Sequence, residues 1–311
     1  MSHRTPSDDP EISVVVPVYD QPELLVEALD SVRDQTFGPL EAVVVDDASE
    51  TDFEPIVDEY GDWVRLLVHE ENRGAAAARN TGIEATDGEF VAFLDADDVW
   101  RPRKLERQRA VFEGRGEDLG LVYAGFVQYD TDGSELVRRP DARGEIHLAE
   151  LERDRVHPTS TVTVRRSCLE RVGGFDPSLP SRQDYDLWIR LTEYYRVDFV
   201  DEVLVEKREQ PGGISKDFDR RIRGDLAVFE KVRKRTADLD LPTRLRIHSF
   251  HHHVIGRDYD SNGDRRKALA HLGLAIAQYP FRPRSWAMFA IALFGVDRNG
   301  RLLGTLKRLA R

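Results

Sequence analysis

Val-rich runs alternate with helical patterns in the first part of the chain, and this alternation limits the possible folds. ISVVVPV (12–18) is apolar almost throughout, as strands covered on both faces are, and LEAVVVDD (40–47), VRLLVH (64–69) and FVAFL (90–94) are the further predicted strands. The segments between them place apolar residues at helical spacing. This order predicts an α/β fold with a mainly parallel, doubly wound sheet, in which ligands bind beyond the carboxyl ends of the strands.

Carboxylates gather where these strands end. Asp46 and Asp47 close the second strand, and Asp95, Asp97 and Asp98 follow the fourth strand within four residues. Buried carboxylates repel one another and are costly without a positive partner. A hard cation such as Mg²⁺ or Mn²⁺ prefers oxygen ligands, and phosphate oxygens commonly complete its coordination. The pattern therefore predicts a divalent cation together with a pyrophosphate-bearing ligand.

A helix is predicted directly after the first strand. Asp20 precedes Pro22 and Glu23, which are typical of the first turn of a helix. We expect Asp20 to be the capping acid of this helix rather than a ligand.

The composition excludes several classes of protein. The 311 residues include 57 acidic and 45 basic ones, a net charge of −12, which argues against a general nucleic-acid binder. Only seven of the basic residues are Lys, and such acid-rich, lysine-poor surfaces suit a high-salt cytoplasm. The single cysteine, Cys168, excludes an internal disulfide and indicates a reducing compartment. There is no secretory pattern and no apolar stretch of about 20 residues, so we expect a cytoplasmic protein.

The strand ends also belong to a longer series of motifs. VVVPVYDQPELLVEALDSVRDQTF, VVVDDASETD and NRGAAAARNTGIEATDGEFVAFLDADD come first, and RRSCLERVGGFDPSL (165–179) and RQDYDLWIRL (182–191) follow. In this order and spacing they resemble the family-two glycosyltransferases, which are inverting enzymes of the GT-A fold. The resemblance covers roughly residues 11–210 and implies a GT-A type sheet that binds a nucleotide-diphosphate sugar.

The resemblance implies donor-binding roles for several positions. Tyr19 would stack on the nucleotide base and Asp47 would hydrogen-bond it, whereas Asp46 would be structural. Arg79 would meet a phosphate or carboxylate, and Asp95 would face the ribose or the donor sugar. The complete implied set is Pro17, Val18, Tyr19, Asp47, Asn72, Gly74, Arg79, Asp95, Ala96 and Arg208.

The resemblance also implies a metal site and a catalytic base. Asp-Ala-Asp at 95–97 fits the family's Asp-x-Asp motif, so Asp97 would bind Mg²⁺ or Mn²⁺ with Asp98 as a second ligand. Asp184 would take the proton of the acceptor hydroxyl, with Asp186 next in line. Gln210 stands where the family often has a metal-binding His.

The implied donor is a UDP- or GDP-sugar, and the implied acceptor is lipid-linked or a growing polysaccharide. The expected setting is lipid-linked glycan or surface polysaccharide assembly.

Two alternatives stay open. A strand followed by Asp-x-Asp also occurs in haloacid-dehalogenase phosphatases, although there it usually lies near the start of the chain. A catalytically inactive member of the same fold would instead be a sugar-nucleotide-binding subunit. Phosphate release from simple phosphoesters would favour the first, and hydrolysis of a sugar nucleotide without acceptor would exclude the second.

Four regions are predicted from the patterns. They are a disordered N-terminus (1–10), a nucleotide-sugar-binding half (11–130), an acceptor-binding half (131–215) and a C-terminal helical region (216–311). Helices are expected at 217–236, 242–259, 264–279 and beyond Pro283. His251, His252 and His253 are expected on the solvated surface, because three consecutive residues cannot share one helical face.

The end of the chain is basic. Residues 281–311 contain seven basic residues and one acid. WAMFAIALFGV (286–296) is too short to span a bilayer, and RLLGTLKRLAR (301–311) places leucines along one helical face. This region would either form a helical hairpin on the catalytic domain or lie on an anionic membrane at its cytoplasmic face. We favour the membrane.

Overall fold

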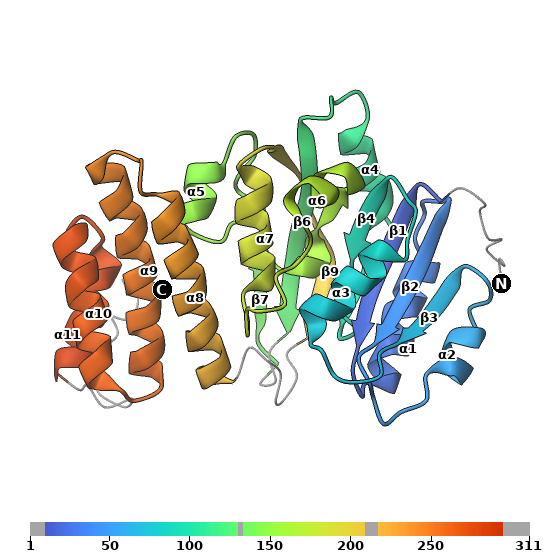
Figure 1. The fold of residues 1–311 in the computed structure, drawn as a ribbon, viewed down its shortest axis with the longest axis horizontal. Coiled ribbons are helices and arrows are strands. Elements are labelled where there is room, and N and C mark those ends of the chain that lie inside the picture. Colours follow the sequence, from blue (N-terminus) through green and yellow to red (C-terminus); the bar gives the residue numbers. More distant parts are fainter. Residues whose placement is uncertain (1–9, 130–132, 209–216, 295–311) are drawn as a thin grey trace. The chain divides into compact units, whose positions relative to one another are not determined.

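The protein consists of two compact units (Figure 1). The computed structural model describes residues 10–129, 133–208 and 217–294. The sheet unit is Met1–Glu150, Arg155–Ser178 and Gln183–Gly213, and the helical unit is Leu151–Asp154, Leu179–Arg182 and Ile214–Arg311. Apart from Pro10, the predicted disordered N-terminus lies outside the described residues.

The first four strands of the sheet unit are parallel, as predicted, and adjoin in the order β3-β2-β1-β4. They are β1 (Ile12–Val18), β2 (Leu40–Asp46), β3 (Val64–Val68) and β4 (Phe90–Phe93). The β1 strand is apolar throughout because Val14 and Val16 pack in one core and Val15 packs in the other. The predicted α/β class is confirmed.

The rest of the sheet mixes parallel and antiparallel pairs, in the order β8-β6-β9-β5 beyond β4. The strands are β5 (Asp98–Trp100), β6 (Leu119–Tyr129), β7 (Glu135–Arg138), β8 (Thr163–Arg165) and β9 (Arg196–Arg208). β6 and β9 are parallel, whereas β8 is antiparallel to both β4 and β6. The antiparallel β5–β9 pair sets Asp98 directly opposite Lys207.

Helices cover both faces of the sheet. Leu25 and Leu29 of α1 and Leu105 of α4 pack in one core, and Ala76 of α3 and Trp188 of α7 pack in the other. The described helices of this unit are α1 (Pro22–Arg33), α2 (Glu54–Asp58), α3 (Ala75–Glu84), α4 (Lys104–Phe112), α6 (Arg166–Val172) and α7 (Gln183–Thr192), with a 3₁₀ turn at Thr159–Thr161. The short helix α5 (His147–Glu152) begins in this unit, and its last two residues belong to the helical unit.

Asp20 does not cap α1, so that prediction is wrong. The residue before the helix is Gln21, whose side chain makes no capping hydrogen bond. Asp20 has a φ of 48°, and its carboxylate accepts the backbone N–H groups of Glu50 at 2.9 Å and Thr51 at 3.3 Å. It therefore stabilises the loop after β2, a contact between distant segments that local spacing does not reveal.

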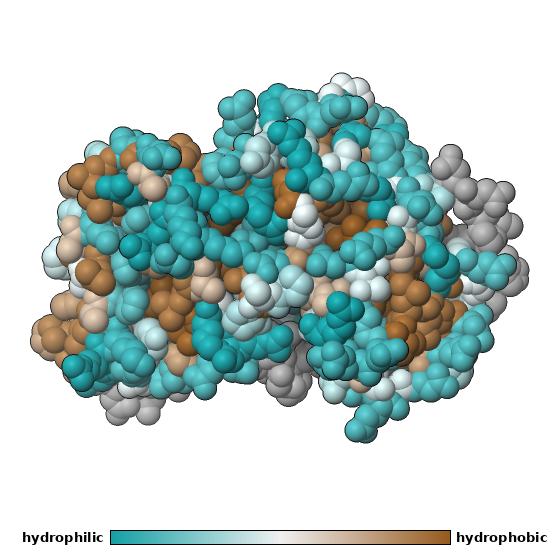
Figure 2. Space-filling view, viewed as in Figure 1, coloured by the Kyte–Doolittle hydropathy of each residue, from teal (hydrophilic) through white to brown (hydrophobic). Residues whose placement is uncertain are grey.

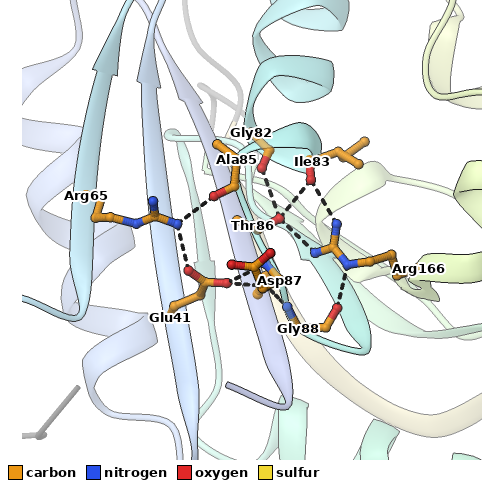
Figure 3. A network of polar contacts seen from close by, with 10 residues as sticks. Glu41, Arg65, Gly82, Ile83, Ala85, Thr86, Asp87, Gly88 and Arg166 are labelled. Atoms are coloured by element: carbon orange, nitrogen blue, oxygen red, sulfur yellow. Dashed lines mark hydrogen bonds and ion pairs between the residues drawn. The ribbon is translucent and has the colours of Figure 1, made fainter. Parts of the chain in front are cut away.

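A polar network fixes the amino end of β4 (Figure 3). Glu41 of β2 accepts the backbone N–H of Asp87 at 3.0 Å and pairs with Arg65 of β3 at 2.9 Å. Arg166 of α6 donates to the carbonyl oxygen of Gly88 at 2.7 Å and to Thr86 Oγ1 at 2.9 Å. The network sets the start of β4, and with it the position of the acidic turn at the other end of that strand.

Four helices lie within the described residues 217–294 of the helical unit, at the predicted positions. They are α8 (Phe218–Arg235), α9 (Leu241–Ser261), α10 (Arg265–Gln278) and α11 (Pro283–Phe294). Asp217, Asp240 and Asp264 cap the first three, each accepting a backbone N–H three residues further on. Within the described residues, no helix is both long enough and apolar enough to cross a membrane. Residues 295–311 of the basic end, for which a membrane contact is predicted, lie outside the described residues.

The three consecutive histidines are not on the solvated surface, so that prediction is wrong. His251 and His253 are each only 7% exposed. The reason is that α9 is packed on several sides, so successive residues meet different neighbours. His251 stacks on Phe229 of α8 with ring centres 4.9 Å apart, and His253 Nδ1 lies 3.1 Å from Ser285 Oγ of α11.

Acid should destabilise the helical unit through these histidines. Burial lowers the pKa of His251 and of His253 from 6.5 to about 4. Because the folded unit binds protons less readily than the unfolded chain, this stabilisation is complete above pH 6.5 and is lost as the pH falls towards 4. A displacement of this size corresponds to about 3 kcal/mol for each residue.

Urea unfolding of the full chain at neutral pH and at about pH 4.5, monitored by circular dichroism, measures this loss. His251→Gln is expected to depend less on pH, because Gln retains a donor for the carbonyl oxygen of Leu151, 2.9 Å from His251 Nε2, but does not titrate. Equal pH dependence in the wild-type protein and the variant would contradict the assignment.

Candidate active site

The acidic turn after β4 brings three carboxylates together. Carboxylate oxygens of Asp95, Asp97 and Asp98 all lie within 4.8 Å of one another. Asp98 is fully buried, and its Oδ2 accepts a 2.6 Å hydrogen bond from Ser160 Oγ. The same hydroxyl oxygen accepts the backbone N–H of Asp95 at 3.1 Å, so the 3₁₀ turn fixes both ends of the acidic turn.

Two cations from distant segments face these acids. Arg79 Nη2 of α3 lies 2.5 Å from Asp95 Oδ1, and Lys207 Nζ of β9 lies 3.8 Å from Asp98 Oδ1. Each pair is well shielded: the Arg79 side chain is 9% exposed and the Asp98 side chain is 0% exposed. The chain therefore supplies part of the positive charge that the carboxylates require.

This compensation is incomplete. Burial raises the pKa of Asp98 to about 7 although Lys207 opposes it, and burial together with Asp95 raises the pKa of Asp97. Burial acts in the same direction on Asp95, but Arg79 and Lys207 outweigh it and lower the pKa. Asp98 Oδ1 is buried and has no hydrogen-bond partner. The cluster thus retains a negative charge excess that a further cation would offset.

Asp184 lies in the same electrostatic field. It sits in the first turn of α7, where Thr159 Oγ1 donates to its Oδ2 at 3.2 Å and the backbone N–H of Tyr185 donates to its Oδ1 at 2.8 Å. The pKa of Lys207 is raised chiefly by Asp98, and Asp184 adds to that effect. Burial lowers the pKa of Arg79, but Asp95 outweighs this effect, and Asp184 and Asp97 add to the rise. The predicted base and Asp97 therefore act on the same two cations.

Asp186 has a different environment. It is 2% exposed and pairs with Arg190 Nε at 3.0 Å. Arg190 also donates to the carbonyl oxygens of Val172 at 2.8 Å and Gly174 at 2.7 Å. Asp186 thus supports the turn between α6 and α7 rather than facing the acidic cluster.

Asp47 holds the loop that precedes α3. Its Oδ1 accepts the backbone N–H of Arg73 at 2.9 Å and lies 2.8 Å from His69 Nδ1, and its Oδ2 accepts the N–H of Gly74 at 2.6 Å. Gly74 has a φ of +86°, a conformation that favours glycine. The loop carries Asn72, which is exposed. Asp47 therefore stabilises this loop, and its contact with the nucleotide base stays a prediction.

The other predicted donor-binding residues flank the acidic turn and the end of β1. Pro17 is partly buried and Val18 is 3% exposed, whereas Tyr19 is 50% exposed and available for stacking. Ala96 is buried inside the acidic turn. Arg208 pairs with Glu27 of α1 instead of approaching the acids.

Lys207 is the main site residue that the sequence did not reveal. Successive side chains of a strand point to opposite faces, so only one of Lys207 and Arg208 can face the acidic turn. The cross-strand partner of Asp98 decides which one, and this register becomes visible only in the sheet. Gln210 lies outside the described residues.

Comparison with known proteins fits this geometry. The family model Glycosyl transferase family 2 matches residues 13–173, which is more than half of the chain. The chain belongs to this family. Membership confirms the predicted family and argues against the phosphatase alternative.

Among curated relatives, the glycosyltransferase AglE of Haloferax volcanii is 32% identical over 230 residues, which cover 71% of this chain and 74% of AglE. The chain spans only 30% to 64% of the length of five uncharacterised rickettsial glycosyltransferases, with 31% to 32% identity.

Solved structures share the fold. Mannosyltransferase PcManGT from Pyrobaculum calidifontis, in complex with GDP-Man and Mn²⁺, superposes with a TM-score of 0.62 at 24% identity, covering 98% of this chain and 86% of that one. S. aureus TarS 1–349 in complex with UDP gives a TM-score of 0.63 at 18% identity, covering 91% and 87%. The predicted GT-A type fold is thereby confirmed.

Removing Lys207 should destabilise the protein when no divalent cation is present. Lys207→Met leaves the buried Asp98 without its cation, and we expect a loss of about 3 kcal/mol in unfolding free energy. Mn²⁺ should restore most of it, because a bound cation would supply the missing charge. Chemical unfolding with and without Mn²⁺ measures both effects.

Arg101→Met, directly after β5, is the matched control. Arg101 pairs with Glu206 of β9 at 3.2 Å, but its side chain is 44% exposed, so we expect a loss below about 1 kcal/mol with no response to Mn²⁺. Identical behaviour of the two variants would show that Lys207 is not the counter-ion of the cluster.

Proposed function

We propose that the protein transfers a sugar from a nucleotide-diphosphate sugar to an acceptor, with inversion at the anomeric carbon. The observation that carries the proposal is that neighbouring residues of one 3₁₀ turn bind both parts of the site: Thr159 donates to Asp184 at 3.2 Å, and Ser160 donates to Asp98 of the acidic turn at 2.6 Å. A base and a charge-compensating centre are thereby available near each other, as a direct displacement requires.

The acidic cluster suits a divalent cation. Three carboxylates within 4.8 Å, a buried Oδ1 of Asp98 without a hydrogen bond and a negative charge excess match the oxygen ligands that Mg²⁺ and Mn²⁺ prefer. Asp97 and Asp98 would hold the ion. When bound, it would offset the charge that develops on the leaving nucleoside diphosphate.

The chain's own residues would perform the remaining steps. Asp184 would accept the proton of the acceptor hydroxyl while the acceptor oxygen bonds to the anomeric carbon. The bond from that carbon to the diphosphate oxygen breaks, and its electron pair leaves with the nucleoside diphosphate. Arg79, held by Asp95, would orient the donor's phosphates. In this mechanism no covalent sugar–protein intermediate would form. The single displacement would invert the configuration at the anomeric carbon.

The donor would be a UDP- or GDP-sugar. TarS has been solved with UDP and with UDP-GlcNAc, and PcManGT with GDP-Man, which supports both bases. Tyr19 would stack on the base, and the loop held by Asp47 would border it. A thermal-shift screen of sugar nucleotides with Mn²⁺ would identify the donor, since a hundredfold excess over Kd stabilises by about 2.7 kcal/mol.

The acceptor would be a lipid-linked glycan or a surface polysaccharide. An inactive donor-binding subunit is the competing function, and retention of Asp97 and Asp184 argues against it. Hydrolysis of the donor without acceptor, dependent on Mn²⁺, would separate the two.

Asp97→Asn is expected to weaken Mn²⁺ binding by roughly a hundredfold or more, because loss of a ligand exceeds the 10–100-fold effect of losing an outer partner. Unfolding free energy without metal should stay equal or rise, since repulsion within the cluster falls. Titration calorimetry with Mn²⁺ measures the affinity. Asp34→Asn, at an Asp whose side chain is 68% exposed, is the control and should bind Mn²⁺ normally. Unchanged affinity in Asp97→Asn would remove the metal assignment.

Asp184→Asn should separate binding from chemistry. The variant keeps the size of the side chain but removes the base, so transfer should fall by roughly 10²–10⁴-fold while donor affinity persists. Single-turnover transfer and donor titration measure the two quantities. Asp186→Asn should instead lower thermal stability, since it breaks the buried pair with Arg190. Loss of donor affinity in Asp184→Asn would place this residue in the donor site and the base elsewhere.

A further inference from the structure

The Gly-Gly-Phe-Asp motif at 173–176 has no role in the chemistry proposed above, although it lies in the sheet unit between α6 and α7. Phe175 is only 2% exposed, so its ring is not part of the hydrophobic patches visible on the face shown in Figure 2. We propose that Phe175 is a positioning residue, which holds the guanidinium of Arg79 in the orientation that binds the diphosphate of the donor. This role rests on the function proposed above, in which Arg79 orients the donor's phosphates.

Arg79 is held between a carboxylate and an aromatic ring. Its Nη2 donates to Asp95 Oδ1 at 2.5 Å, and its guanidinium carbon lies 5.3 Å from the centre of the Phe175 ring. The side chain is 9% exposed, and its Nε is buried without a hydrogen-bond partner within the described residues. A cation removed from water is attracted to the face of a ring more strongly than an exposed one. The ion pair fixes one nitrogen, and the ring supplies a second contact that restricts the orientation of the group.

Asn80, which follows Arg79 in α3, fixes the backbone of Phe175. Its Nδ2 donates to the carbonyl oxygen of Phe175 at 2.8 Å, and its Oδ1 accepts the backbone N–H of Phe175 at 2.8 Å. Gly174 leaves room for this pair of bonds, because a Cβ atom there would lie 2.3 Å from Asn80 Oδ1. The cation and the residue that supports it are therefore anchored at adjacent positions of one helix.

The Phe175 ring also contacts the elements that carry the acidic turn and the predicted base. It meets the ring of Phe93 edge-on, with centres 5.2 Å apart, and the ring of Trp188 with centres 6.3 Å apart. Phe93 is the last residue of β4, two residues before Asp95, and Trp188 lies about one helical turn after Asp184 in α7. Aromatic pairs of this kind prefer defined orientations. The ring is thus held in place by the same strand and helix that position the acids.

A role in packing alone is the competing explanation, because Phe175 belongs to the hydrophobic core beneath α3 and α7. The two roles make different demands on the side chain. Packing requires an apolar group of suitable volume, whereas support of a cation requires the negative face of an aromatic ring. Replacements that keep the volume and change the ring face distinguish them.

Phe175→Leu keeps an apolar side chain and removes the ring. We expect the Kd for UDP or GDP, in the presence of Mn²⁺, to rise about tenfold, because a desolvated contact between a cation and a ring contributes on this order. The Kd for Mn²⁺ alone should be unchanged, since Asp98 is held by Ser160 and Lys207 rather than by Arg79. Titration calorimetry of the full-length protein measures both constants.

Phe90→Leu is the matched control. Phe90 is also 2% exposed, and Arg109 and Arg165 lie over its ring at 5.4 Å and 5.0 Å, but it stands at the amino end of β4, opposite the acidic turn. Both variants should lower the midpoint of thermal unfolding by about 2–6 °C, because each loses packing of similar size. Only Phe175→Leu should weaken the binding of the nucleotide.

A fluorinated phenylalanine at position 175 tests the ring face directly. Fluorine atoms withdraw electron density from the face of the ring and change its size little, so the contact with Arg79 weakens while the packing is retained. The Kd for UDP or GDP should then rise by at least about threefold, without a matching change in the unfolding midpoint. A side chain that only fills the core would not produce this difference.

Three results would overturn the role of Phe175 while leaving the proposed transfer intact. They are nucleotide affinities that are equal in Phe175→Leu and Phe90→Leu, an equal loss of Mn²⁺ and nucleotide binding in Phe175→Leu, and an unchanged nucleotide affinity with the fluorinated ring. A wild-type protein that binds neither UDP nor GDP in the presence of Mn²⁺ would instead contradict the proposed function, and the role of Phe175 with it.

Discussion

Compensation of charge at one turn governs the arrangement of the sheet unit. Three carboxylates at the end of β4 can stay close together only because Arg79 arrives from α3 and Lys207 from β9, while Ser160 binds the turn from the 3₁₀ segment. Each of these residues depends on a separate stretch of chain reaching the same edge of the sheet. The residual negative charge is then a property of the fold, and it makes the turn suitable for a cation that the chain does not provide.

The surrounding elements restrict how far this turn can move. At one end of β4, Glu41 and Arg166 bind the connection from α3, and at the other end Ser160 binds both Asp95 and Asp98. Asp20 and Asp47 do the same for two neighbouring loops by accepting backbone N–H groups. Acids at the strand ends therefore have two roles. Some hold loops in place, and those of the acidic turn retain more negative charge than the nearby cations neutralise. A preorganised site of this kind suits catalysis by positioning and electrostatics.

In the helical unit, burial determines the role of side chains that could otherwise bind a metal. The consecutive histidines of α9 resemble a metal tract, yet they pack against neighbouring helices: His251 is stacked on Phe229 of α8, and His253 lies against Ser285 of α11. In α11 the distribution is mixed, because Ser285 is buried and Trp286 is half exposed, while Phe289 packs against the helical core. The buried histidines of this unit therefore serve packing rather than metal binding.

The sequence by itself determined the parallel half of the sheet, because strands buried on both faces must be largely apolar. It also determined the acidic turn, because the Asp-x-Asp residues are close together in the chain. It also located the four C-terminal helices, whose capping acids and apolar periodicity are local signals. Tertiary structure alone decided that Lys207 rather than Arg208 faces the acids, that Asp20 binds a distant loop, and that His251 and His253 are buried. These outcomes depend on strand register and on which helices pack together. The spacing of neighbouring residues in the sequence predicts neither of them.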